Sequence, residues 1–112
     1  MKQMRERRSE PRYMCSELVT LRVYHAAQSP AECVVNLEDI SASGACLHSE
    51  TAVAQGNAIE MITPRCSFKG VVRYCRFVEI GFDIGVSFES RAVWNRDRFE
   101  PAHLLDVPVR GR

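Results

Sequence analysis

The stretch VTLRVY, residues 19–24, decides the fold, because apolar and polar side chains alternate along it one position at a time. A period of two puts successive side chains on opposite faces, which is typical of a β-strand with one buried face. The alternation predicts a strand over 13–25. It recurs in residues 84–88, where it predicts the last strand of the chain, over 80–88.

Between these two strands the pattern predicts four more, which are separated by residues that favour turns. They span residues 31–40, 45–48, 58–63 and 66–78. Six short strands at roughly regular intervals are typical of an antiparallel barrel or sandwich, so we expect a small all-β domain.

After residue 90 the spacing of apolar residues changes to that of a short C-terminal α-helix, with Pro101 in its first turn. The apolar residues that indicate this helix are Trp94, Phe99, Leu104 and Leu105. We expect the helix to cover an open end or edge of the sheet. Trp94 and Phe99 could pack on the barrel or on a second chain, and we favour the barrel.

Length and composition fit one globular domain, with 112 residues of which 46% are hydrophobic and 26% charged. No apolar run approaches the ~20 residues that span a bilayer, and the basic N-terminus lacks the apolar core of a secretory signal. The five cysteines form no CxxC pair and the three histidines are scattered. We therefore expect reduced thiols, no metal site and a cytoplasmic location. The sequence shows neither a nucleophile paired with a base nor a catalytic carboxylate pair, so we do not expect an enzyme.

Positive charge is concentrated at the N-terminus, although the net charge of the whole chain is only +1. The first twelve residues carry five Lys or Arg side chains against two Glu side chains, which leaves the remainder net acidic. A mobile basic segment suits a small anionic ligand better than a long nucleic acid, which needs a broad basic face. We expect a flexible basic arm at 1–12, a β-barrel domain with its helix at 13–106 and a tail at 107–112.

Two short motifs carry the candidate chemistry. The first is RxxxR, formed by Arg8 and Arg12, and the second is DxSxxG, formed by Asp39, Ser41 and Gly44. A guanidinium group donates paired hydrogen bonds to phosphate oxygens or to the O6 and N7 edge of guanine. An aspartate accepts from the N1–H and N2–H₂ groups of guanine, and a glycine leaves room for a base. Taken separately, the motifs also fit a solvated tail and an ordinary turn.

In this order and spacing the two motifs resemble those of the PilZ domain family, whose members bind the bacterial second messenger cyclic di-GMP. Residues 84–88 are similar to the late G-V-x-F strand of that family, and residues 101–106 to its common C-terminal segment. The resemblance covers about residues 7–106. It implies a standalone PilZ domain, built as a six-stranded antiparallel β-barrel with a short C-terminal α-helix.

The resemblance also implies roles for the motif residues. Arg8 and Arg12 would engage guanine and phosphate of cyclic di-GMP, whereas the DxSxxG residues would hold a guanine edge. In this family an arginine directly before RxxxR favours an intercalated pair of ligand molecules, and a bulky apolar residue favours one. Arg7 holds this position, so we expect two cyclic di-GMP molecules and no other cofactor.

Ligand binding is expected to order the arm and so to relay a signal to an unidentified downstream effector protein. Two other functions stay open. One is a PilZ-like protein-interaction module that does not bind nucleotide, and the other is a single-strand nucleic-acid binder of the small-barrel type. The net acidic charge outside the arm disfavours the second. We expect neither nucleic-acid binding nor membrane insertion.

Overall fold

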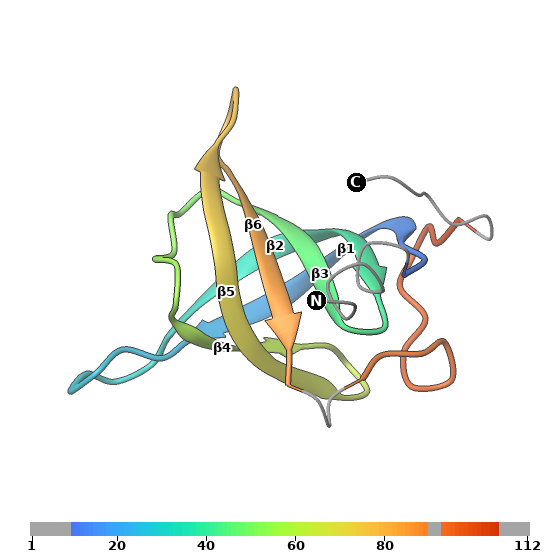
Figure 1. Cartoon of the computed structure of the whole chain (residues 1–112), viewed down its shortest axis with the longest axis horizontal. Coiled ribbons are helices and arrows are strands. Elements are labelled where there is room, and N and C mark those ends of the chain that lie inside the picture. The colour runs from blue at the N-terminus through green and yellow to red at the C-terminus, as the bar shows by residue number, and fades with distance from the viewer. Residues whose placement is uncertain (1–9, 90–92, 106–112) are drawn as a thin grey trace, which may run out of the picture.

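Six antiparallel strands form a closed barrel in the computed structural model, which describes residues 10–89 and 93–105 (Figure 1). The strands are β1 (Tyr13–Val23), β2 (Ala31–Ser41), β3 (Gly44–Ser49), β4 (Ala58–Ile62), β5 (Ser67–Phe77) and β6 (Phe82–Phe88). They pair in the order β1-β2-β3-β6-β5-β4, and β4 closes the barrel onto β1. The predicted six-stranded antiparallel barrel is confirmed, and each strand ends within two residues of its predicted bounds.

Apolar side chains fill the interior of the barrel. Val19, Leu21 and Val23 of β1 point inward, as their alternation predicts, and each is at most 5% exposed. Phe68 of β5 is fully buried and stacks on Phe88 of β6, with ring centroids 5.0 Å apart. The remaining strand residues of the core are Val35, Leu37, Ile40, Ala45, Leu47, Ile59, Met61, Val72, Ile84 and Val86. Because side chains occupy the interior, binding surfaces are to be sought on the outer wall.

One β-bulge interrupts the ladder in each of β1, β2 and β5. In β2 the extra residue is Glu38, because Leu37 and Asp39 pair with consecutive residues of β3. Leu37 and Ile40 are therefore both buried in the core, although they are three positions apart. Strict alternation would have turned Asp39 into the core, whereas the bulge turns it to the outer wall.

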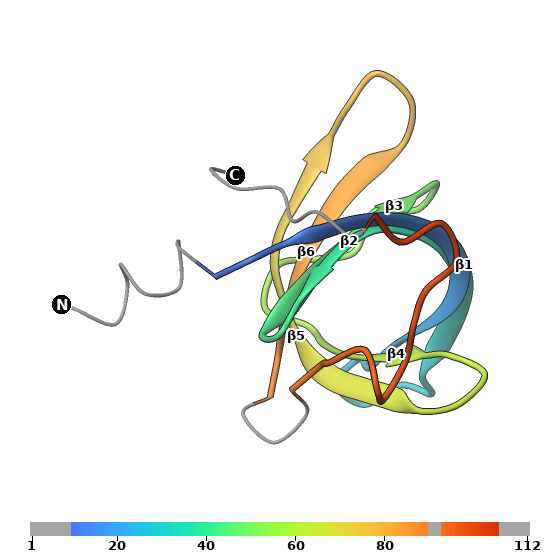
Figure 2. The ribbon, with the colours of Figure 1, turned by 90° about the vertical axis from the view of Figure 1, so that its right-hand side faces the viewer.

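The predicted C-terminal helix is not confirmed, since residues 93–105 run through successive turns along one end of the barrel (Figure 2). His103 has a φ of 59°, outside the right-handed helical region, so the chain after Pro101 does not continue as a helix. In the described part of the chain there is no helix of the length and apolar character needed to cross a membrane. The expected tail at 107–112 and most of the expected arm lie outside the described residues.

The same segment nevertheless covers the end of the barrel, as expected of the helix. Trp94 is 4% exposed and Phe99 is 3% exposed, and both belong to the core of the barrel. The Trp94 Nε1–H donates to the Phe99 carbonyl at 2.7 Å. The backbone N–H of Trp94 donates to Ala42, and that of Leu105 donates to Met14, each at 2.9 Å. Trp94 and Leu105 thus bond to the barrel, while Arg98 and Phe99 bond to the Asn95 carbonyl in a turn within the segment.

Candidate functional site

Four neighbouring strands, β2, β3, β6 and β5, form the wall that carries the candidate site. Their register aligns outward-facing residues in rows that cross the wall. The three rows are Ser41, Gly44 and Ser87; Asp39, Cys46, Gly85 and Tyr74; and His48, Asp83 and Arg76. The tight turn between β2 and β3 therefore brings the whole DxSxxG motif to one corner of this wall.

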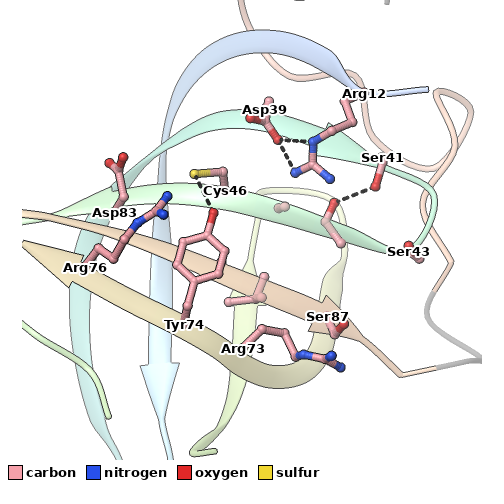
Figure 3. Close-up of a pocket in the computed structure, with 14 residues that line it drawn as sticks. Arg12, Asp39, Ser41, Ser43, Cys46, Arg73, Tyr74, Arg76, Asp83 and Ser87 are labelled. Atoms are coloured by element: carbon pink, nitrogen blue, oxygen red, sulfur yellow. Dashed lines mark hydrogen bonds and ion pairs between the residues drawn. The ribbon is translucent and has the colours of Figure 1, made fainter. Parts of the chain in front are cut away.

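The wall is hollowed into a pocket of about 660 Å³ (Figure 3). Small residues of these rows, among them Gly44, Cys46 and Gly85, line the pocket. A Cβ added at Gly85 would collide with the ring of Tyr74, and one added at Gly44 would collide with the carbonyl oxygen of Val86. Both glycines permit close approaches that any larger residue would block.

Arg12 joins the two motifs directly. Its Nε donates to Asp39 Oδ1 at 3.1 Å, and its Nη2 donates to the same oxygen. The side chain of Asp39 is only 3% exposed, whereas that of Arg12 is 30% exposed. A carboxylate buried to this degree needs a charged or hydrogen-bonding partner, and Arg12 supplies one at the edge of the pocket.

The described part of the arm, residues 10–12, is anchored at the turn between β2 and β3. The Glu10 carboxylate accepts hydrogen bonds from the Ser43 N–H at 2.7 Å and from the Ser43 hydroxyl at 2.9 Å. The Ser41 hydroxyl donates to the Gly44 carbonyl at 3.3 Å and so closes the same turn. The RxxxR segment thus contacts the DxSxxG segment twice, through Arg12 and through Glu10.

Strand β5 adds two cations and an aromatic ring to the pocket. Arg73 and Arg76 both line it, and the Arg76 guanidinium carbon lies 4.8 Å from the centroid of the Tyr74 ring. Burial raises the pKa of Tyr74 to about 12 and that of Cys46 to about 11. The phenol and the thiol are therefore neutral at neutral pH, and the thiol is not an activated nucleophile. Arginines and carboxylates supply the charge of the pocket.

Four of the six predicted site residues, Arg12 and the three of DxSxxG, line this one pocket. The other two, Arg7 and Arg8, lie outside the described residues, so the structure does not place them. Sequence reasoning missed the wall formed by β5 and β6. The sequence RYCR at 73–76 gave a signal, because it brackets a tyrosine with two arginines inside a strand. The bulge that turns both Arg73 and Tyr74 to the pocket has no such signal.

A closed antiparallel barrel with an arginine-lined pocket on its outer wall places the chain among the small β-barrel domains. The model of one family, the PilZ domain, matches residues 6–98. This match includes both motifs and all six strands, and the chain belongs to the PilZ domain family. A comparison with curated proteins gave no match.

Proposed function

We propose that this protein is a receptor that binds cyclic di-GMP in the outer-wall pocket and is not an enzyme. The observation that carries the proposal is the direct contact of Arg12 with Asp39 at the edge of a pocket lined by further arginines. The two motifs can act on one ligand only if they lie at one site. The contact between Arg12 and Asp39 brings one residue of each motif to the same place. Membership of the PilZ family supports the same ligand.

The chemistry of the pocket fits both parts of the ligand. The Asp39 carboxylate accepts from the Watson–Crick edge of a guanine, and Arg12 donates to its O6 and N7 edge or to phosphate. The exposed guanidinium groups of Arg73 and Arg76 offset the charge of the two phosphodiesters. Tyr74, at the far side of the pocket from Arg12, offers a ring face on which a base can stack. Arg8 extends the cationic edge of the pocket in this proposal.

Arg7 provides the proposed second binding step, in which an intercalated pair of ligand molecules occupies the site. A third guanidinium can stack on a base and offset the added negative charge. We expect calorimetry to give about two ligands per chain for the natural sequence. Arg7→Leu should lower that number to about one while Arg12 and Asp39 keep the first ligand. An unchanged stoichiometry would remove the role of Arg7 and leave the single-ligand site standing.

The proposed output is a change in the arm and its surroundings. Glu10 already ties the base of the arm to the turn at Ser43, so a ligand held by Arg12 and Asp39 lies where the arm leaves the barrel. Ordering of the arm over the ligand would create a new surface for the downstream effector. The five cysteines, all free in the structure, fit a reducing compartment, and we propose the cytoplasm.

The deciding experiment is a calorimetric titration with cyclic di-GMP at low salt, with cyclic di-AMP as the control ligand. The control carries the same phosphodiesters, but adenine lacks the N1–H donor and the O6 acceptor that Asp39 and Arg12 would recognise. We expect binding of the guanine ligand alone. Equal binding of both ligands would mean that the site recognises phosphate and not guanine. No heat from either ligand would favour the PilZ-like interaction module that does not bind nucleotide.

A further inference from the structure

Three side chains that can bind metal converge on the same wall as the pocket, and one of them, Asp83, also lines the pocket. Glu38 lies at the bulge of β2, His48 on β3 and Asp83 on β6, so that three adjacent strands supply one group each. One ligand atom from each of them lies within 4.8 Å of the other two. All three residues are half-buried, which leaves the cluster accessible from solvent. In the sequence they are far apart, which is why the scattered histidines predicted no such site.

The distance between His48 and Asp83 suits a shared metal ion better than a hydrogen bond. The two residues are direct cross-strand partners, and His48 Nδ1 lies 3.4 Å from Asp83 Oδ1. That distance is long for a hydrogen bond between nitrogen and oxygen. Two ligands of one tetrahedral Zn²⁺, each about 2.1 Å from the metal, are about 3.4 Å apart. A metal therefore needs little movement of this pair, and the Glu38 carboxylate, within 4.8 Å of both ligand atoms, has to move closer.

The fold also limits how the imidazole can turn. A Cβ at Gly81 would come within 2.9 Å of His48 Nε2 and 3.2 Å of Cε1, so the ring lies against the turn between β5 and β6. That side of the ring faces the glycine, and the Nδ1 side faces Asp83. The turn therefore limits the rotation of the ring while Nδ1 is directed toward Asp83.

We propose that Glu38, His48 and Asp83 form a binding site for a divalent transition-metal ion of the Zn²⁺ class. One imidazole nitrogen and two carboxylates suit such a metal, whereas Mg²⁺ and Ca²⁺ prefer oxygen ligands alone. Water completes the coordination on the exposed side. On β5 the cross-strand neighbour of Asp83 is Arg76, whose positive charge opposes that of the metal, and the affinity is therefore moderate.

The test is a titration of the untagged protein with Zn²⁺ alone, followed by calorimetry at neutral pH and without nucleotide. We expect one saturable site per chain with a micromolar Kd. His48→Ala should weaken it at least tenfold, and Glu38→Gln several-fold, because each removes a ligand atom. His25→Ala is the matched control, since His25 is an exposed histidine in the turn between β1 and β2, and it should leave the affinity unchanged.

The five cysteines could also capture Zn²⁺, so a second probe separates the two sources. Co²⁺ bound by His48 and the two carboxylates gives a visible spectrum without the near-ultraviolet band of a cobalt–thiolate bond. A strong thiolate band, or equal Zn²⁺ affinity of the natural protein and of folded His48→Ala or Glu38→Gln, would overturn the proposal. Absence of saturable binding would do so as well, and none of these outcomes bears on the nucleotide site.

Discussion

The guanidinium group of Arg12, at the end of the arm, binds the almost fully buried carboxylate of Asp39 on β2. The pair joins residues 27 positions apart and links the last residue of RxxxR to the first residue of DxSxxG. Each motif residue is thereby held in place by the other. A change at either position should alter both the order of the arm and the recognition of a ligand.

Arg12→Ala should weaken cyclic di-GMP binding by about 100-fold, because the loss of charge-assisted hydrogen bonds amounts to about 3 kcal/mol. Arg12→Lys should recover only part of this, since an ammonium group lacks the planar fork. Arg22→Ala is the matched control: it removes the same charge from β1, where Arg22 pairs with Glu32 and Glu60. Calorimetry with the three variants measures the effect. Equal losses for Arg12→Ala and Arg22→Ala would show that only total charge matters.

Glu10→Ala should weaken ligand binding several-fold, because the arm then loses its anchor on the N–H and hydroxyl groups of Ser43 and has more conformational entropy to lose. Glu10→Gln keeps an acceptor oxygen and should bind more tightly than Glu10→Ala. The comparison is made by calorimetry at one salt concentration. Tighter binding by both variants than by the natural protein would mean instead that the Glu10 carboxylate competes with the ligand.

Gly85→Ala should damage the pocket more than the fold. The added methyl group collides with the flexible ring of Tyr74, which can rotate away, so we expect a loss of about 1–2 kcal/mol in unfolding free energy. Gly44→Ala collides with the backbone carbonyl of Val86, which cannot rotate away, and should cost about 3 kcal/mol or more. Urea denaturation measures both. A larger loss for Gly85→Ala than for Gly44→Ala would contradict the view that the Tyr74 ring can move away and the Val86 carbonyl cannot.

Stability should fall as the pH rises above about 9. Burial raises the pKa of Cys46 to about 11 and that of Cys15 to about 12, from an ordinary value near 9. The folded protein thus holds these thiol protons more tightly than the unfolded chain does. The resulting stabilisation is complete below the ordinary thiol pKa and is lost as the pH rises toward the folded values. Urea midpoints should therefore decrease between about pH 9 and pH 11, and less steeply in Cys46→Ala.

Trp94→Ala should lower the free energy of unfolding by about 3–5 kcal/mol, as expected for a large aromatic residue removed from a core. The side chain is 4% exposed and also donates to the Phe99 carbonyl. Arg96→Ala, two residues away, changes an exposed side chain whose ion pair with Glu100 is on the surface, and should cost under about 1 kcal/mol. Comparable losses of unfolding free energy in both variants would mean that burial of Trp94 at the end of the barrel does not stabilise the fold.

Strand positions could be predicted because each strand needs only one apolar face, and β1 shows that face as a clean alternation. The C-terminal helix could not be excluded from sequence, because Trp94 and Phe99 have a spacing that also suits turns capping a barrel. The outcome depends on backbone hydrogen bonds to Ala42 and Met14. Those partners lie far away in the sequence, and no local pattern reports them.

The candidate site could be predicted in part for a similar reason. Asp39, Ser41 and Gly44 stand close together in the sequence, and their turn is a local structure. Arg76 and Tyr74 join them only through the ladder from β2 to β5, whose register depends on bulges and on the closure of the barrel. The sequence around such a residue does not show which distant strand it will pair with, so its place in the site cannot be predicted from that segment alone.

The bulge at Glu38 shifts the alternation of inward and outward side chains along β2 by one residue. Before it, the inward residues are Val35 and Leu37, and after it the inward residue is Ile40. The shift depends on the presence of the extra residue at position 38 and not on its side chain, so substituting Glu38 should affect only what that side chain binds. Deleting Glu38 should leave Asp39 facing outward and Ile40 facing inward, because the strand after Leu37 would then alternate without a bulge.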